Sequence, residues 1–335
     1  MKRAIALLFL LFIFTGCKAE QSPEEPSLVV GFSQSGTESS WRKHYTDSVI
    51  NELEKNDYQV LYRNGFLNHE RQLQDVRTFI AYKVDLILIT PLQEDGWDAV
   101  LEEARLAEIP VITVDRHITA KDSSLLTSHV GSSFKAEGNR AGLFVSNSFL
   151  NSDLKEVKIL ELMGSSQTSA TTLRSEGFKE TLNQPAVLKE DGTTDYKPKM
   201  TVTTQLNGNF MRNQGKEVLK EYIQNHDLNE INVLFSHSDE MTLGALEAIS
   251  ETDIRPGKDL LIVTIDGQQN ALDKLATGQI NCIVESKAEV GWYVANTVTR
   301  YFRDQKSGRI LPHEIYVPGT VFTQHNLASV PSRNY

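Results

Sequence analysis

The chain has 335 residues, a length that predicts two domains or one large domain. Its 34 Lys and Arg residues against 44 Asp and Glu residues give a formal net charge of −10, which argues against nucleic-acid binding because neutralising phosphates needs a basic face. The two cysteines, Cys17 and Cys282, are too few for a disulfide framework or a zinc site.

The N-terminal segment has the pattern of an export signal. Two basic residues precede residues 4–14, an apolar run without charge, which is much shorter than the roughly 20 residues of a membrane-spanning helix. Such a run behind a basic start is typical of a secretory signal peptide. It ends in T-G-C at Cys17, which resembles the lipobox of bacterial lipoproteins, where the cysteine is lipidated. We therefore predict a signal peptide at residues 1–16, a lipidated Cys17 and a flexible tether over residues 17–26, with a secreted chain and a chance cysteine as the alternative.

Short apolar runs alternate with amphipathic stretches in the next part of the chain. Residues 85–90 (DLILIT) form an unbroken apolar run, typical of a strand buried on both faces of a parallel sheet. Residues 70–82 instead carry apolar side chains at helical spacing. Strands are predicted at residues 28–32, 59–62, 85–90 and 110–114, and helices at residues 41–55, 70–82 and 97–107. Helical crossovers of this length require parallel strands.

The same alternation repeats in the second part of the chain. Strands are predicted near residues 125–130 and at 157–162, 200–205, 233–236, 260–265 and 282–285, helices at 134–149, 169–182, 210–225, 240–250, 269–277 and 290–305, and an extended tail at 315–322. Two successive units of this kind predict an α/β fold with two doubly wound domains.

Sequence motifs of common enzymes do not occur in the chain. It has no P-loop, no G-x-G-x-x-G after the first strand and no G-x-S-x-G elbow. The cluster of residues 237–240 (HSDE) is contiguous rather than spaced like metal ligands, and we interpret Asp239 as the N-cap of a helix.

Polar and aromatic side chains recur after the predicted strands. Because ligands of open α/β sheets bind at the carboxyl ends of the strands, these residues predict a shared site. They are Trp41, Arg42, Asp115, Arg116, Arg174, Phe210, Ser238 and Asp266. Carboxylates and guanidinium groups can pair with hydroxyl groups, and aromatic rings can cover a sugar face, so the set suits a small, neutral, polyhydroxylated ligand. Taken singly, each residue could instead be a core residue, a turn residue or part of a surface ion pair.

The motifs around these residues carry a resemblance to a known family. They are SQSGTESSWR, ITVDRHI, NGNFMRNQGKEV, HSDEMTLGALEAI and IVTIDGQ. With them the chain resembles the periplasmic substrate-binding proteins for sugars of the ribose and galactose type, and among these the galactofuranose-binding proteins of ABC importers. The resemblance implies two Rossmann-like lobes of the periplasmic binding protein type I, joined by three hinge strands, with the ligand cleft between them.

The resemblance also implies lobe boundaries and contact residues. The N-terminal lobe would comprise residues 27–129 and 286–317, the C-terminal lobe residues 130–285 and 318–335, with crossovers near residues 128–131, 285–287 and 317–320. Trp41, Arg42, Asp115 and Arg116 would contact ligand from the first lobe, Arg174, Phe210, Ser238 and Asp266 from the second, and Glu285 from beside the hinge. Leu173, Asn209 and Ser238 depart from the residues of close relatives, so another small sugar is the alternative to galactofuranose.

The function implied is that of an exported protein without catalytic activity, cofactor or metal. As a monomer it would capture a monosaccharide by hinge closure and deliver it to an ABC permease driven by a separate ATPase. One alternative is a ligand-binding partner of a chemoreceptor or histidine kinase. A periplasmic glycoside hydrolase is disfavoured because no catalytic triad is recognisable, and a LacI-type repressor because the export signal occupies the place of its DNA-binding region.

Overall fold

The computed structural model describes residues 27–186, 194–305 and 310–335. The predicted signal peptide and the predicted tether, with the lipidation site at Cys17, therefore lie outside the described residues. None of the helices described is long and apolar enough to cross a membrane. Cys282 is buried and makes no disulfide bond.

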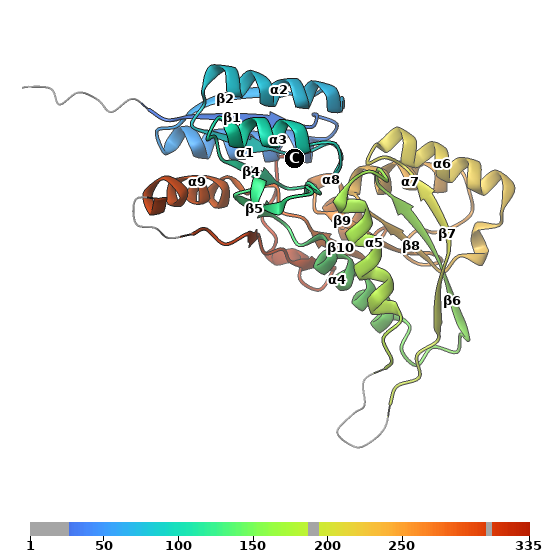
Figure 1. Ribbon diagram of the computed structural model, residues 1–335. Coiled ribbons are helices and arrows are strands. Elements are labelled where there is room, and N and C mark those ends of the chain that lie inside the picture. The colour runs from blue at the N-terminus through green and yellow to red at the C-terminus, as the bar shows by residue number, and fades with distance from the viewer. Residues whose placement is uncertain (1–26, 187–193, 306–309) are drawn as a thin grey trace, which may run out of the picture.

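The first of two sheets is built mainly from the N-terminal part of the chain (Figure 1). Its strands are β1 (Val29–Gln34), β2 (Gln59–Asn64), β3 (Leu86–Ile89), β4 (Val111–Val114), β5 (Ser128–Gly131) and β11 (Glu314–Tyr316). They lie in the order β11-β5-β4-β3-β1-β2 and are all parallel. The strand order reverses at β1 and β3, where the connections leave for opposite faces of the sheet.

The second sheet repeats this arrangement. It comprises β6 (Glu156–Met163), β7 (Lys199–Asn207), β8 (Val233–Ser236), β9 (Leu261–Asp266), β10 (Cys282–Glu285) and β12 (Val321–Phe322). The order is β12-β10-β9-β8-β6-β7, parallel except for the short β12. The predicted α/β fold with two doubly wound sheets is therefore confirmed.

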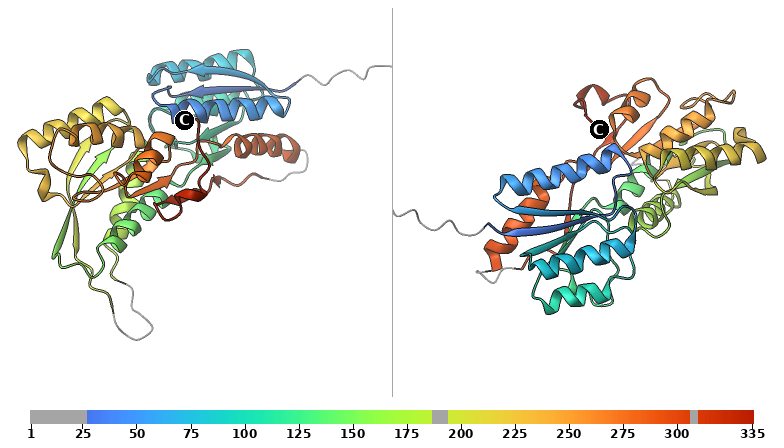
Figure 2. Two further views of the ribbon diagram at one scale, coloured as in Figure 1. Left: turned by 180° about the vertical axis from the view of Figure 1, so that it is seen from behind. Right: turned by 90° about the horizontal axis from the view of Figure 1, so that it is seen from above.

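Helices cover both faces of each sheet (Figures 1 and 2). On the first sheet, α1 (Ser40–Lys55) and α9 (Gly291–Gln305) cover one face, and α2 (His69–Tyr82) and α3 (Asp98–Leu106) the other. On the second sheet, α4 (Phe134–Ser148) and α5 (Ser169–Leu182) oppose α6 (Arg212–Asn225), α7 (Asp239–Ile249) and α8 (Gln269–Ala276). Apolar runs such as β3 are buried on both sides by this layering.

The C-terminal helix α9 packs on the first sheet although it follows the second sheet in the chain. It lies beside α1, and Val294 and Val298 are fully buried in the same core as Val30 and Phe32. Burial of each such side chain contributes about 1.5–3 kcal/mol. The chain passes between the sheets after β5, after β10, and between β11 and β12. The lobe boundaries at residues 129, 285 and 317 stay predictions.

Three local predictions need correction. The strand predicted near residues 125–130 begins only at Ser128, because a 3-10 turn occupies Ser123–Leu125. The extended tail divides into β11 and β12, which belong to different sheets. Ser238, and not Asp239, caps α7: the Ser238 hydroxyl accepts the Met241 N–H, whereas the Asp239 carboxylate is buried and turned toward the end of β9.

Candidate functional site

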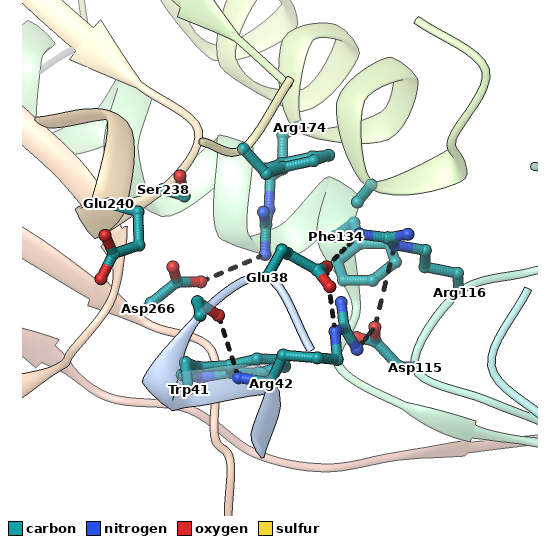
Figure 3. Close-up of a pocket in the computed structure, with 13 residues that line it drawn as sticks. Glu38, Trp41, Arg42, Asp115, Arg116, Phe134, Arg174, Ser238, Glu240 and Asp266 are labelled. Atoms are coloured by element: carbon teal, nitrogen blue, oxygen red, sulfur yellow. Dashed lines mark hydrogen bonds and ion pairs between the residues drawn. The ribbon is translucent and has the colours of Figure 1, made fainter. Parts of the chain in front are cut away.

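A pocket lies where the carboxyl ends of the two sheets face each other (Figure 3). The empty space between its lining atoms, including the part that is open to solvent, is about 410 Å³. Its lining residues are Glu38, Ser39, Trp41, Arg42, Asp115, Arg116, Phe134, Ala170, Arg174, Phe210, Ser238, Glu240 and Asp266. Both sheets therefore contribute side chains to one site.

The start of α1 presents a cation to the pocket. Ser39 caps this helix by accepting the N–H of Arg42, which fixes the first turn. The Arg42 guanidinium then donates to the Asp115 carboxylate at 2.6 Å and lies 3.4 Å from Glu38. Burial by itself would lower the pKa of Arg42, but the charges of Asp115 and Glu38 outweigh it and hold that pKa above its usual value. Arg42 is thus a fixed, charged group.

Arg116 is less completely paired than Arg42. Its guanidinium lies 3.7 Å from Glu38 and 3.9 Å from Asp115, and its buried Nε has no hydrogen-bond partner. Burial, together with the nearby charge of Arg42, lowers the pKa of Arg116 to about 10. Asp115, at the end of β4, has a left-handed backbone with φ of 68°. The Arg116 guanidinium therefore has donor capacity left for a ligand.

Arg174 brings a third guanidinium from the second sheet. Thr168 caps α5, and Arg174 follows in its second turn. The Nε of Arg174 donates to Glu137 and its Nη1 to the carbonyl of His237, both at 2.8 Å. Its guanidinium also lies 5.0 Å from the centre of the Phe134 ring. Arg174 is therefore held in place from two sides and can present its remaining nitrogen to the pocket.

Asp239 and Asp266 lie side by side at the end of β9, where the backbone N–H of Asp239 donates to the Asp266 carboxylate at 3.3 Å. Asp239 accepts the backbone N–H groups of Gly267 and Gln268 at 2.7 Å and the Thr264 hydroxyl at 3.0 Å. Burial raises the pKa of Asp239 to about 7. Burial and the neighbouring charge of Asp239 raise the pKa of Asp266 well above its ordinary value. Asp266 can thus carry a proton in the pocket at neutral pH.

Aromatic rings border the pocket from both sheets. The Trp41 indole N–H donates to the carbonyl of Ser286 at 2.8 Å, and its ring stacks on Tyr45. Phe210, on the loop after β7, and Phe134, at the start of α4, approach from the second sheet. These rings offer apolar faces beside the charged groups.

Every predicted contact residue except Glu285 lines the pocket. The Glu285 carboxylate instead pairs with Arg333 at 2.5 Å and accepts the Thr320 N–H at 3.0 Å. Its strand-end position resembles that of the other predicted residues, but the C-terminal tail covers it. A ligand contact by Glu285 is therefore not supported by this geometry.

Several lining residues were not predicted, above all Glu38, Phe134 and Glu240. Glu38 precedes a helix in a polar loop, and Phe134 starts a helix like an ordinary core residue. Glu240 lies two residues after Ser238, in the HSDE cluster noted in the sequence. That cluster could therefore have identified Glu240 as a lining residue.

A group of potential metal ligands lies outside the pocket lining. His117, His129 and Glu314 have their ligand atoms within 4.8 Å of one another. The two imidazole rings stack, however, with centroids 3.7 Å apart and an interplanar angle of 22°. Their in-plane lone pairs run nearly parallel, which does not suit coordination of one ion by both rings.

Comparison with known proteins identifies the family. The model of the periplasmic binding protein domain matches residues 30–306, which span both sheets and the pocket between them. The chain belongs to the periplasmic binding protein family. Its members are binding proteins, and this periplasmic binding protein is accordingly not an enzyme.

Several characterised relatives are similar along most of their length. The galactofuranose-binding protein YtfQ of Escherichia coli is 33% identical over 83% of this chain and 83% of its own. The ribose import binding protein RbsB of Bacillus subtilis is 26% identical over 97% of this chain and all of its own. The structure of the binding protein of the arabinose ABC transporter from Shewanella, bound to L-arabinofuranose, superposes with a TM-score of 0.79 at 33% identity, covering 90% of this chain and 93% of that chain. A galactofuranose-binding protein structure superposes with a TM-score of 0.80 at 30% identity, covering 90% and 96%.

Proposed function

We propose that this periplasmic binding protein captures a small sugar in the furanose form and delivers it to an ABC importer. The observation that carries the proposal is the composition of the pocket between the sheets. Each of its guanidinium groups, Arg42, Arg116 and Arg174, has a carboxylate partner. A pocket with balanced charges and many donors and acceptors suits a neutral ligand rich in hydroxyl groups.

The names of similar proteins support a five-membered sugar ring. The relatives at 30% identity or more are named for galactofuranose, or bound to L-arabinofuranose or β-D-fucofuranose. D-Galactofuranose, D-fucofuranose and L-arabinofuranose share the configuration of the ring carbons and differ only in the exocyclic group. We infer that the pocket selects this shared ring configuration. Leu173, Asn209 and Ser238, which lie in or beside the lining, would adjust the preference for the exocyclic group.

Capture would proceed by hinge closure. The lobes would comprise residues 27–129 with 286–317, and residues 130–285 with 318–335. Pocket groups come from both sides, so a ligand makes all its contacts only when the lobes are together, and it therefore stabilises the closed state.

A thermal-shift panel tests the proposed ligand class. The purified protein would be heated with L-arabinose, D-galactose, D-fucose, D-ribose, D-fructose and myo-inositol, and with methyl β-D-galactofuranoside against methyl β-D-galactopyranoside. A sugar at a hundredfold excess over its Kd stabilises the folded state by about 2.7 kcal/mol. We expect the furanoside to shift the Tm and the pyranoside not to. Shifts by ribose or fructose alone would rule out the proposed ring configuration, and no shift by any sugar would rule out the sugar class.

We also propose that the protein is exported and held on a membrane by lipid at Cys17. The apolar run ending in T-G-C supports this. The change Cys17→Ala should release the protein from the membrane fraction or leave it unprocessed. A wild-type protein that fractionates as soluble and begins at a residue other than 17 would contradict the lipid anchor.

A further inference from the structure

We propose that the ligand site continues from the pocket into a groove at the rim of the cleft. The groove is lined by Leu67 from the first lobe and by Met211, Arg212 and Lys216 from the second. The ligand would then be a furanosyl disaccharide or glycoside, with one furanose ring in the pocket and the second unit in the groove. This inference rests on the proposed function.

The groove and the pocket are contiguous. Glu38 and Glu240 line both of them. In Figure 3 Glu38 lies in the middle of the labelled residues, and Glu240 lies at their left edge beside Ser238. A ligand unit that extends past these two shared carboxylates would enter the groove.

The two cationic side chains that line the groove are each paired with a carboxylate. Arg212 contacts Glu240 at 2.9 Å, and Lys216 contacts Glu247 at 3.1 Å. Leu67 and Met211 add apolar surface to the groove, and Glu38 and Glu217 line it as further carboxylates. A groove whose cations are neutralised, and whose remaining carboxylates can accept hydrogen bonds from hydroxyl groups, suits a neutral ring better than an anion.

Glu38 lines both the pocket and the groove, and one of its carboxylate oxygens has no hydrogen-bond partner. One of its oxygens lies 3.4 Å from Arg42 and 3.7 Å from Arg116. The other oxygen, Oε2, is buried and has no hydrogen-bond partner, and the side chain is only 7% exposed. Buried acceptors without partners are costly. A hydroxyl group near the linkage between two sugar units would supply the missing donor.

A duplicated loop places Leu67 at the cleft. The edge strands β2 and β7 are each followed by the same turn, N-G-F-L at residues 64–67 and N-G-N-F at residues 207–210. In both turns the asparagine side chain accepts the N–H two residues later, at 2.7 Å for Asn64 and 3.0 Å for Asn207. In both, the third and fourth residues have a left-handed backbone. The two loops are therefore equivalent parts of the two lobes.

This equivalence pairs Leu67 with Phe210. Phe210 enters the pocket from the second lobe, and Leu67 enters the groove from the first. Leu67 is 41% exposed. Its φ of 57° lies in the left-handed region, which is unfavourable for a large apolar residue. Its side chain also lies so close to Gly36 that a Cβ there would come within 2.7 Å of Leu67. The loop thus holds an apolar side chain at the cleft that has no covering partner within the described chain.

The test compares ligands of two sizes in matched variants. Isothermal titration would use L-arabinose against its furanose disaccharide arabinobiose, and methyl against para-nitrophenyl β-D-galactofuranoside. Leu67→Asn removes the apolar side chain and keeps a residue that tolerates the left-handed backbone. Leu106→Asn is the control, because Leu106 is also exposed but lies at the end of α3, outside the groove lining.

We expect the longer ligand of each pair to bind at least about tenfold more tightly than the shorter one, and Leu67→Asn to abolish that difference. The control should preserve it. If the small ligands bind and the longer ones bind no better, or if Leu67→Asn leaves the difference intact, the groove is not part of the sugar site. If Leu67→Asn changes only the stimulation of permease ATPase activity in membrane vesicles, the groove is a docking surface and the inference is wrong. If none of the four ligands binds, the proposed function itself is contradicted.

Discussion

The guanidinium of Arg116 lies over the ring of Phe210, 5.3 Å from its centroid, although the two residues follow strands of different sheets, β4 and β7. Further contacts cross the cleft beside them. Ser40 donates to Gln268, and the N–H of His117 donates to the Ser169 hydroxyl at 2.9 Å. Loops of the two sheets therefore contact each other in this structure, and the proposed hinge motion would break and re-form the Arg116–Phe210 contact.

Replacing Phe210 tests this contact. Phe210→Ala removes the ring that faces Arg116 and a pocket wall, so we expect sugar affinity to fall at least about tenfold. The Tm of the empty protein should change little, because Phe210 is only partly buried. Tyr82→Ala, which removes a ring that is 72% exposed on α2, is the control. Titration calorimetry measures affinity, and an affinity equal to wild type would exclude Phe210 from the ligand site.

Asp115 is the first-lobe carboxylate on which binding should depend most. Asp115→Asn keeps the shape, and Asn tolerates the left-handed backbone, but one acceptor becomes a donor. Hydrogen bonds to charged groups contribute about 1.5–3 kcal/mol, so affinity should fall at least about tenfold. The empty protein should also lose some stability, because Asp115 is the partner of the buried Arg42.

A second buried aspartate separates the two effects of this change. Asp75 is equally buried and pairs with Arg63 at 2.6 Å, but it does not line the pocket. Asp75→Asn should lower stability and leave sugar affinity unchanged. Equal affinity in wild type and Asp115→Asn would show that Asp115 is structural only.

The sequence was most informative where a residue follows directly on a buried strand. Asp115 and Asp266 could be predicted as site residues, because an apolar run predicts each strand and the chain direction predicts which end of it is the carboxyl end, where ligands bind. Glu285 was placed in the site by the family resemblance, and nothing local in the sequence shows that Arg333, 48 residues later, neutralises it. Glu38 was missed for the opposite reason, because its role depends on guanidinium groups that only the folded chain brings together.

The acidic pair of Asp239 and Asp266 should make stability depend on pH. Both pKa values in the folded protein lie above 3.8, the usual value of an aspartate. The folded state therefore holds protons that the unfolded state releases, and this contribution to stability is lost as the pH rises from about 4 through 7. Asp266→Asn removes one of these protons, so the Tm of the variant relative to wild type should increase with pH.

An exposed aspartate with the opposite shift provides the control for this titration. Hydrogen bonds from Arg255 lower the pKa of Asp259 to about 2. Its stabilising contribution is present above the unfolded value and is lost as the pH falls. The Tm of Asp259→Asn relative to wild type should therefore decrease as the pH rises from 2 to 5. Thermal melts across pH 2–9 measure the Tm of each variant relative to wild type. A Tm difference between Asp266→Asn and wild type that does not vary with pH would contradict the raised pKa of Asp266.

The ion pair of Glu285 and Arg333 should support the fold and not the ligand. Arg333 also donates to the carbonyl of Gly267 at 2.7 Å and lies over the Phe322 ring, so it fastens the C-terminal tail to the second sheet. Both side chains are at most 10% exposed, and removing one partner of such a buried pair costs about 3–5 kcal/mol. Glu285→Gln and Arg333→Gln should therefore each lower the Tm by several degrees, whereas Arg255→Gln, at an exposed pair, should not. The two changes together should cost less than their sum, because each removes the same interaction.

Sugar affinity should stay within about threefold of wild type in both variants, because neither residue lines the pocket. A Glu285→Gln variant with an unchanged Tm and an affinity at least about tenfold weaker would instead make Glu285 a ligand contact, as the family resemblance implied.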